Sequence, residues 1–272
     1  MGATNRIDAI FEKLRADGRK ALMPFVCAGY PSIEATTEVL PALGEAGGSI
    51  IEIGFPFSDP IADGPTIAAA MHEALQRGLT TEHIFRSVRS IRDSTDAGLV
   101  AMVSVSIVQR MGAAAFATQA ADAGFDGVII PDVPVDEAES VLPAFRDANL
   151  TTSLLVSPTT PPDRAARIAG ACTGFVYVLA RVGITGEGGG GAVPTEGPSL
   201  QQRVAALRAV TDLPLACGFG IASADDVASV VGAGGADAAI VGSAIVKRMG
   251  SGPDAAAVAS GFVRELAAGL PH

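Results

Sequence analysis

Several residue types are scarce in this chain of 272 residues. It has no tryptophan, two tyrosines, three cysteines and three histidines. Because Cys27, Cys172 and Cys217 are odd in number and far apart, they exclude a secreted disulfide framework and favour reduced thiols in a cytoplasm. The histidines show no zinc-ligand spacing. We therefore expect no metal site and a cytoplasmic location.

Positive charge and long apolar runs are also lacking. The chain carries 19 Lys and Arg against 29 Asp and Glu, giving a formal net charge of −10, and has no basic cluster. This balance excludes a nucleic-acid partner, which would require a basic stripe. No apolar run approaches the roughly 20 residues of a membrane span. The first residues are polar, unlike a signal peptide, but Ile7, Ile10, Phe11 and Leu14 fall at helical spacing, so we expect an N-terminal amphipathic helix.

Short apolar segments are what the chain has in abundance. They alternate with amphipathic stretches about eight times, which predicts an α/β fold, a single (β/α)8 barrel over residues 1–272 with an extra N-terminal helix. The open doubly wound sheet is the alternative, but the strand count and the absence of an early GxGxxG disfavour it. The expected strands are Leu22–Cys27, Ile50–Ile53, Leu99–Val105, Gly127–Ile130, Thr152–Val156, Gly174–Leu179, Leu213–Cys217 and Ala238–Val241. The expected helices are Ile33–Ala46, Thr66–Gln76, His83–Arg92, Ala113–Ala123, Glu137–Asp147, Arg164–Ala169, Leu200–Val210, Ala224–Val231 and Asp254–Leu266.

The segment from Ile50 to Thr66 places acids in unusual surroundings. Glu52 lies inside an apolar strand, where a carboxylate costs several kcal/mol unless it is paired, protonated or facing a cavity. Asp63 follows in a loop that Pro56, Pro60, Gly64 and Pro65 restrict. A buried Arg or backbone amides could satisfy Glu52 structurally. Two carboxylates near one strand end favour acid–base catalysis.

Glycines follow the last three expected strands. Gly218 and Gly220 come after the seventh, Gly242 and Ser243 open a helix after the eighth, and Gly183 and Gly186 follow the sixth. Any one glycine could simply make a tight turn. Three such turns together favour a phosphate site built from backbone amides, in the position where barrels of this kind hold phosphate. The glycine-rich segment from Arg181 to Pro194 is interpreted as a lid that closes over ligand.

The segment around Glu52 and Asp63 resembles the signature of the tryptophan synthase alpha chain family, a strand ending in Glu-x-Gly followed by Pro-Phe-Ser-Asp-Pro-x-Ala-Asp-Gly-Pro. More than ten consecutive positions match, which is far more specific than a lone glycine motif. The resemblance extends over nearly the whole chain in the family's order. It recurs at Pro24-Phe25, Ala28 to Pro31, Pro131 to Pro134, Arg181 to Gly186, Gly218 to Ile221 and Gly242 to Val246.

The resemblance implies a reaction and roles for particular residues. The reaction is the reversed aldol cleavage of indole-3-glycerol phosphate to indole and glyceraldehyde 3-phosphate, a carbon–carbon lyase step of tryptophan biosynthesis. Glu52 matches the general acid and base, and Asp63 the group that binds the indole N–H. Tyr177 matches the site tyrosine, and Thr185 the lid residue that orients the second carboxylate. Phe25 is expected against the flat ring of the substrate, although an ordinary core position is equally consistent with its strand.

The resemblance also implies a partner. The family works with a beta chain that carries pyridoxal phosphate, in an alpha2-beta2 assembly, so no cofactor is expected in this chain. The loop from Pro56 to Asp59 and the turn from Pro131 to Pro134 match regions that meet this partner.

One stretch departs from the family pattern. After the third strand the family commonly has Tyr-x-Asn, whereas this chain has Ser104-Val105-Ser106. The loss of a ring and an amide predicts a reshaped indole pocket or partner-facing surface. Two other functions remain open from the residues: a different phosphate-binding barrel enzyme, such as a sugar-phosphate isomerase or epimerase, and a non-catalytic subunit that binds ligand to regulate its partner. The pairing of Glu52 with Asp63 disfavours both.

Overall fold

A parallel β-sheet organises the chain. The computed structural model describes residues 4–60, 63–180, 198–218, 220–252 and 254–271. In these residues nine strands pair in the order β5-β4-β3-β2-β1-β9-β8-β7-β6, and every pairing is parallel. The strands are β1 (Ala21–Cys27), β2 (Ile50–Gly54), β3 (Gly98–Met102), β4 (Gly127–Ile129), β5 (Thr151–Ser153), β6 (Leu155–Val156), β7 (Val176–Leu179), β8 (Leu215–Gly218) and β9 (Ala238–Val241).

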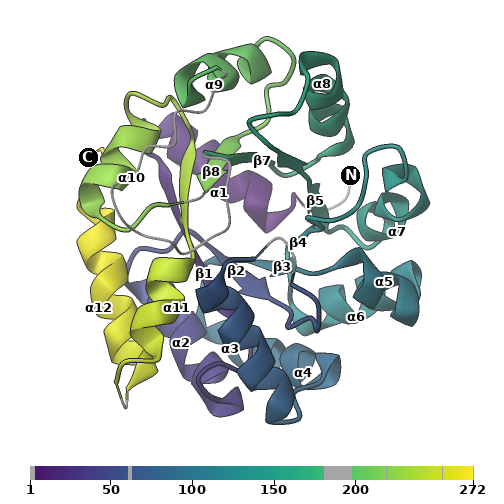
Figure 1. The fold of residues 1–272 in the computed structure, drawn as a ribbon, viewed down its shortest axis with the longest axis vertical. Coiled ribbons are helices and arrows are strands. Elements are labelled where there is room, and N and C mark those ends of the chain that lie inside the picture. The colour runs from purple at the N-terminus through teal and green to yellow at the C-terminus, as the bar shows by residue number, and fades with distance from the viewer. Residues whose placement is uncertain (1–3, 61–62, 181–197, 219, 253, 272) are drawn as a thin grey trace.

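The two ends of this strand order belong to one continuous stretch of chain. β5 and β6 are separated by Leu154 alone, whose carbonyl accepts a hydrogen bond of 3.1 Å from the amide of Tyr177. The stretch therefore pairs with β4 through its first half and with β7 through its second half, which joins the sheet into a barrel (Figure 1). The predicted (β/α)8 barrel is confirmed. The fifth strand, expected as Thr152–Val156, is a pair of short strands at this junction.

Helices surround the strands, as Figure 1 shows. Most follow the expected segments, with ends shifted by a few residues. They are α2 (Ile33–Glu45), α3 (Pro65–Gln76), α4 (Thr81–Ile91), α5 (Val105–Met111), α6 (Ala113–Ala123), α7 (Leu142–Asp147), α8 (Pro162–Ala171), α9 (Leu200–Arg208), α10 (Ala224–Val231), α11 (Ser243–Met249) and α12 (Ala255–Ala267), with short 3-10 turns η1 (Arg92–Ser94) and η2 (Ala138–Ser140).

The structure corrects two expected elements. The third strand ends at Met102 instead of Val105, because Ser104 caps α5 by accepting a hydrogen bond from the amide of Ser106. The local capping bond competes with extension of the strand. The helix expected over Glu137–Asp147 is divided into η2 and α7. α7 begins with Pro143 in its first turn, where the missing N–H of proline costs no helical hydrogen bond.

The extra N-terminal helix, α1 (Arg6–Ala16), closes the amino end of the barrel, and Figure 1 shows it inside the ring of strands. The side chain of Asn5 accepts from the amide of Ile7 (2.8 Å) and donates to the carbonyl of Asp126 (2.8 Å), which fixes the start of the helix. Ile7, Phe11 and Leu14 are buried in one apolar cluster with inward residues of the strands. The rings of Phe11 and Phe175 lie 6.1 Å apart.

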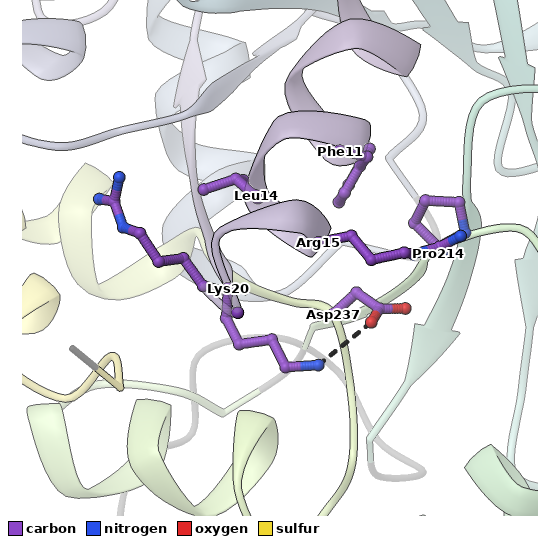
Figure 2. Close-up of a pocket in the computed structure, with 8 residues that line it drawn as sticks. Phe11, Leu14, Arg15, Lys20, Pro214 and Asp237 are labelled. Carbon is purple, nitrogen blue, oxygen red and sulfur yellow. Dashed lines mark hydrogen bonds and ion pairs between the residues drawn. The ribbon is translucent and has the colours of Figure 1, made fainter.

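A small cavity of about 120 Å³ marks this amino end (Figure 2). Phe11 and Leu14 contribute its apolar wall, and Lys20 and Asp237 form an ion pair of 3.1 Å at its edge. Asp237 also accepts from the amide of Leu215 at 2.9 Å. These contacts tie α1, β8 and β9 together, and the amino face of a barrel characteristically serves stability in this way.

Candidate active site

Glu52 lies at the centre of the barrel. It pairs in register with Phe25 of β1 and Val100 of β3. Because side chains alternate along a strand, Glu52 shares the inward face of β2 with Ile50, whereas Ile51 packs in the outer core. Its exposure is 0%, and neither carboxyl oxygen has a hydrogen-bond partner within the described residues. Burial raises the pKa of Glu52 well above its ordinary value, because removal from water disfavours the charged carboxylate.

Tyr177 faces the same interior from β7. It is buried in the inner cluster with Ile129 of β4 and Ile240 of β9. Its pKa is raised well above the ordinary value by burial and, to a smaller extent, by Glu52 and Asp63. A Cβ atom on Gly218 of the neighbouring strand would lie 2.5 Å from the Tyr177 hydroxyl. Gly218 therefore leaves the room that this hydroxyl occupies.

Asp63 approaches from the loop between β2 and α3. Its amide donates to the carbonyl of Pro60 (3.1 Å), and its side chain is partly buried. Burial, with a smaller contribution from Asp132, raises the pKa of Asp63 to about 6. The thiol of Cys27, at the carboxyl end of β1, has its pKa raised by burial and by Asp63. Asp63 thus lies close enough to Cys27, Asp132 and Tyr177 to interact with them electrostatically. These four residues define the candidate site around Asp63.

Asp132 and Ser104 are site neighbours whose contact with each other the sequence analysis did not predict. The hydroxyl of Ser104 donates to one carboxylate oxygen of Asp132 (2.6 Å), and the amide of Val105 donates to the other (2.8 Å). Asp132 is therefore held at the start of α5. The departure at Ser104 could have drawn attention to this position, but its pairing with Asp132 spans 28 residues of sequence and had no local signal.

Phe25, expected to contact the substrate ring, lies beside Gly242, which is expected to contact the phosphate. The Phe25 ring is buried in a small cluster with Cys27, Met71 and Val246 at the carboxyl end of the barrel. A Cβ atom on Gly242 would lie 3.4 Å from Cδ1 of Phe25, so Gly242 borders the ring directly.

The remaining phosphate candidates lie at the same carboxyl end or beyond the described part. Ser243 is the first residue of α11, and Gly220, two residues after β8, has a φ of +76°, a backbone conformation that glycine adopts readily. Gly183, Thr185 and Gly186, together with the expected lid, lie outside the described residues.

The part of the chain that the structure describes holds no group of three or more His, Cys, Asp or Glu side chains placed to bind a metal ion. Cys27, Cys172 and Cys217 are free and buried, as their apolar context predicts. Among the described helices, none combines the length and the hydropathy needed to cross a membrane.

A (β/α)8 barrel with one fully buried carboxyl group facing its interior and a second carboxyl group in the loop after the same strand has the features of a barrel enzyme built for proton transfer. Comparison with known proteins identifies the kind. The family model of the tryptophan synthase alpha chain matches residues 11–268. The chain is 42% identical over 241 residues to the tryptophan synthase alpha chain of Synechococcus sp. (strain CC9902), covering 89% of this chain and 87% of that one.

Solved structures agree with the sequence comparison. A structure of Mycobacterium tuberculosis tryptophan synthase superposes with a TM-score of 0.87 at 35% identity, covering 98% of each chain. Tryptophan synthase subunit alpha from Legionella pneumophila gives a TM-score of 0.86 at 31% identity, also covering 98% of each chain. The chain belongs to the tryptophan synthase alpha chain family. Its role is in tryptophan biosynthesis, and this family of lyases is known for the cleavage of indole-3-glycerol phosphate.

Proposed function

We propose that this chain is a carbon–carbon lyase that cleaves indole-3-glycerol phosphate to indole and glyceraldehyde 3-phosphate. The observation that carries the proposal is the state of Glu52, which is fully buried, faces the barrel interior and has no partner for either carboxyl oxygen among the described residues. A carboxyl group satisfied by a structural partner would have an arginine or amides around it. This one is available for substrate.

The reaction requires two proton transfers. Carbon 3 of the indole ring must gain a proton, and the hydroxyl on the adjacent side-chain carbon must lose one as it becomes the aldehyde. The electron pair of the broken carbon–carbon bond returns to the ring. Glu52 serves both transfers in turn, since its raised pKa favours the protonated form that donates to carbon 3, and the carboxylate formed on donating that proton is the base for the hydroxyl.

Asp63 supplies the second carboxyl group. With a pKa of about 6 it is mostly ionised at neutral pH. In that form it accepts a hydrogen bond from the indole N–H and stabilises the positive charge that develops on the ring nitrogen when carbon 3 is protonated. The two acids thus divide the work because burial affects Glu52 more than Asp63.

Tyr177 and Phe25 form walls of the proposed indole pocket. Both are buried and point inward from β7 and β1, which places them on the same interior as Glu52. The phosphate group of the substrate is bound by Gly220, Gly242 and Ser243, with Gly183, Thr185 and Gly186 contributing from the segment outside the described residues. What supports this placement is the approach of Gly242 to Phe25 and the position of these residues just after β8 and β9.

The partner is a tryptophan synthase beta chain in an alpha2-beta2 assembly, and pyridoxal phosphate belongs to the beta chain alone. The loop of Pro56 to Asp59 and the turn of Pro131 to Pro134 face this partner. In the first, Ser58 and Asp59 are exposed and Phe57 is partly exposed; in the second, Pro134 is exposed. The chain functions as one domain over residues 1–272 in the cytoplasm.

The deciding experiment measures indole release from indole-3-glycerol phosphate by the purified chain, alone and with a beta chain. Release of indole with stoichiometric glyceraldehyde 3-phosphate is the expected result. Binding of substrate without release, in both conditions, would favour the non-catalytic subunit instead.

A further inference from the structure

An arginine behind the barrel wall contacts the end of the strand that carries Tyr177. Arg203 lies on α9, and its Nη1 and Nη2 atoms donate to the carbonyls of Leu179 (2.7 Å) and Ala180 (2.9 Å). These carbonyls belong to the last two described residues before the segment 181–197, and α9 begins just after that segment. Arg203 therefore joins the first half of α9 to the end of β7.

The guanidinium group is committed to these carbonyls. In the described part of the chain it has no carboxylate partner, and burial lowers its pKa while the Cys217 thiol acts in the opposite direction. A half-buried cation without a counter-ion is costly unless its donors are well used. The planar fork of arginine reaches two adjacent carbonyls at once, which a lysine ammonium cannot reproduce.

The end of β7 is held from both sides as a result. The amide of Ala180 donates to the carbonyl of Gly218 on β8 (2.8 Å), while the two carbonyls are held by α9. Tyr177 lies two residues before Leu179 and faces inward with it. The end of β7, and with it the strand that carries Tyr177, is thus fixed between β8 and α9.

We propose that Arg203 is a positioning residue of this enzyme, which sets the end of β7, and through it Tyr177, for substrate binding. The expected effect on KM rests on the proposed function. The anchoring of the end of β7 by Arg203 does not. Arg203 touches no substrate. Its contribution is expected in the Michaelis constant more than in the rate of the chemical step.

Arg146 provides a matched control. It also donates to a backbone carbonyl, that of Ala171 (3.1 Å), and its Nε atom, like that of Arg203, is buried without a partner within the described residues. Arg146 lies on α7 and joins it to the end of α8 instead of to β7. Replacing either arginine by methionine keeps the apolar stem and removes every donor.

The test compares Arg203→Met, Arg203→Lys and Arg146→Met in steady-state cleavage of indole-3-glycerol phosphate, with thermal stability measured in parallel. Arg203→Met should raise KM about 10-fold or more while lowering kcat less, since two charge-assisted hydrogen bonds are lost. Arg203→Lys should restore part of the loss. Arg146→Met should lower the melting temperature without changing KM more than about 2-fold. Equal changes in KM for the two methionine variants would overturn the proposal.

Hydrogen exchange of the Ala180 amide tests the role of Arg203 independently of the proposed reaction. Arg203→Met should speed exchange of the Ala180 amide, and Arg146→Met should not. If the wild-type chain cleaves no substrate but the exchange difference is present, the reaction assignment fails and the anchoring by Arg203 stands. If cleavage occurs and exchange at Ala180 is the same in both variants, the assignment of Arg203 fails and the reaction stands.

Discussion

At the scale of single residues, the site depends on two carboxyl groups whose pKa values are both raised chiefly by burial. The pKa of Glu52 is raised by burial alone, whereas Asp63 combines partial burial with the nearby charge of Asp132. Burial therefore favours the protonated form of Glu52, whereas Asp63, with a pKa of about 6, is mostly ionised at neutral pH. A proton donor and an anionic hydrogen-bond acceptor result from one residue class in two environments.

We expect Glu52→Gln to abolish cleavage. The amide keeps the size and polarity of the protonated carboxyl group but cannot exchange a proton with substrate, and loss of a general acid–base group costs about 10²-fold or more. The measurement is kcat for indole release, with substrate binding followed separately by calorimetry. Retention of more than about a tenth of the wild-type rate would contradict the role of Glu52.

The stability of the same variant provides its control. In the unfolded chain Glu52 ionises near its ordinary pKa, but in the folded chain its pKa is raised. The folded state then binds more protons, so the wild-type chain loses stability as pH rises above about 4.5, by about 1.4 kcal/mol per pH unit until the folded pKa is reached. Glu52→Gln does not titrate. It should unfold at a higher temperature than wild type at pH 8, with the difference vanishing near pH 4.

The pKa of Asp63 should determine how kcat/KM falls on the acid side of its pH profile. If its carboxylate form binds the indole N–H, kcat/KM should fall as pH decreases through about 6, the folded pKa of this group. Replacing its charged neighbour by Asp132→Asn should move this limb to lower pH, because one source of the raised pKa is removed. Asp63→Asn should lower the rate about 10²-fold, and its profile should no longer show the fall in kcat/KM near pH 6. A limb that stays in place in Asp132→Asn would show that Asp63 does not control it.

At the scale of elements, hydrophobic patterning was enough to predict the eight-strand cycle and the N-terminal helix. The error in the third strand arose where side chains bind backbone. Apolar residues continue past Met102, so pattern alone extends the third strand, but Ser104 caps α5 and Asp132 accepts from the Val105 amide. Asp132 follows another strand, β4, so its contact with the Val105 amide could not be predicted from the local sequence.

The turn between β9 and α11, which contains Gly242, gives a prediction about phosphate binding. Gly242→Val should raise KM for the phosphate-bearing substrate about 10-fold or more, because the added methyl groups would press on Phe25, 3.4 Å from the new Cβ, and displace the backbone near the phosphate. Gly170→Val is the control, since a Cβ there meets nothing within 4 Å. Steady-state kinetics of both variants test this. If replacing a surface lysine or arginine raises KM more than Gly242→Val, the phosphate is held by side-chain charge instead of this turn.

At the scale of the whole molecule, the barrel explains how distant residues meet. Glu52 lies within β2, Tyr177 lies within β7 and Asp132 follows β4. Parallel pairing points the carboxyl ends of these strands toward the same end of the barrel. The carboxyl pair could be found from sequence because an acid in an apolar strand is a local signal. The contribution of Arg203 could not, since its partners lie in another element and an arginine on a helix normally indicates solvent exposure.

Assembly supplies the last prediction. Ser58 and Asp59 next to Phe57 are exposed, and Phe57 is partly exposed although it is a large apolar side chain, which is consistent with a surface covered by the beta chain. Phe57→Asp should weaken binding to a tryptophan synthase beta chain about 10-fold or more, because a charge would be buried on association. Indole release by the free chain should change little.

Val210→Asp is the matched control for this surface. Val210 is 53% exposed and follows α9, which leads away from the carboxyl face toward the start of β8. Its replacement should leave assembly unchanged. Sedimentation of each variant with the beta chain gives both affinities. Wild-type affinity for Phe57→Asp, or equal weakening by the two variants, would place the partner on another face of the barrel.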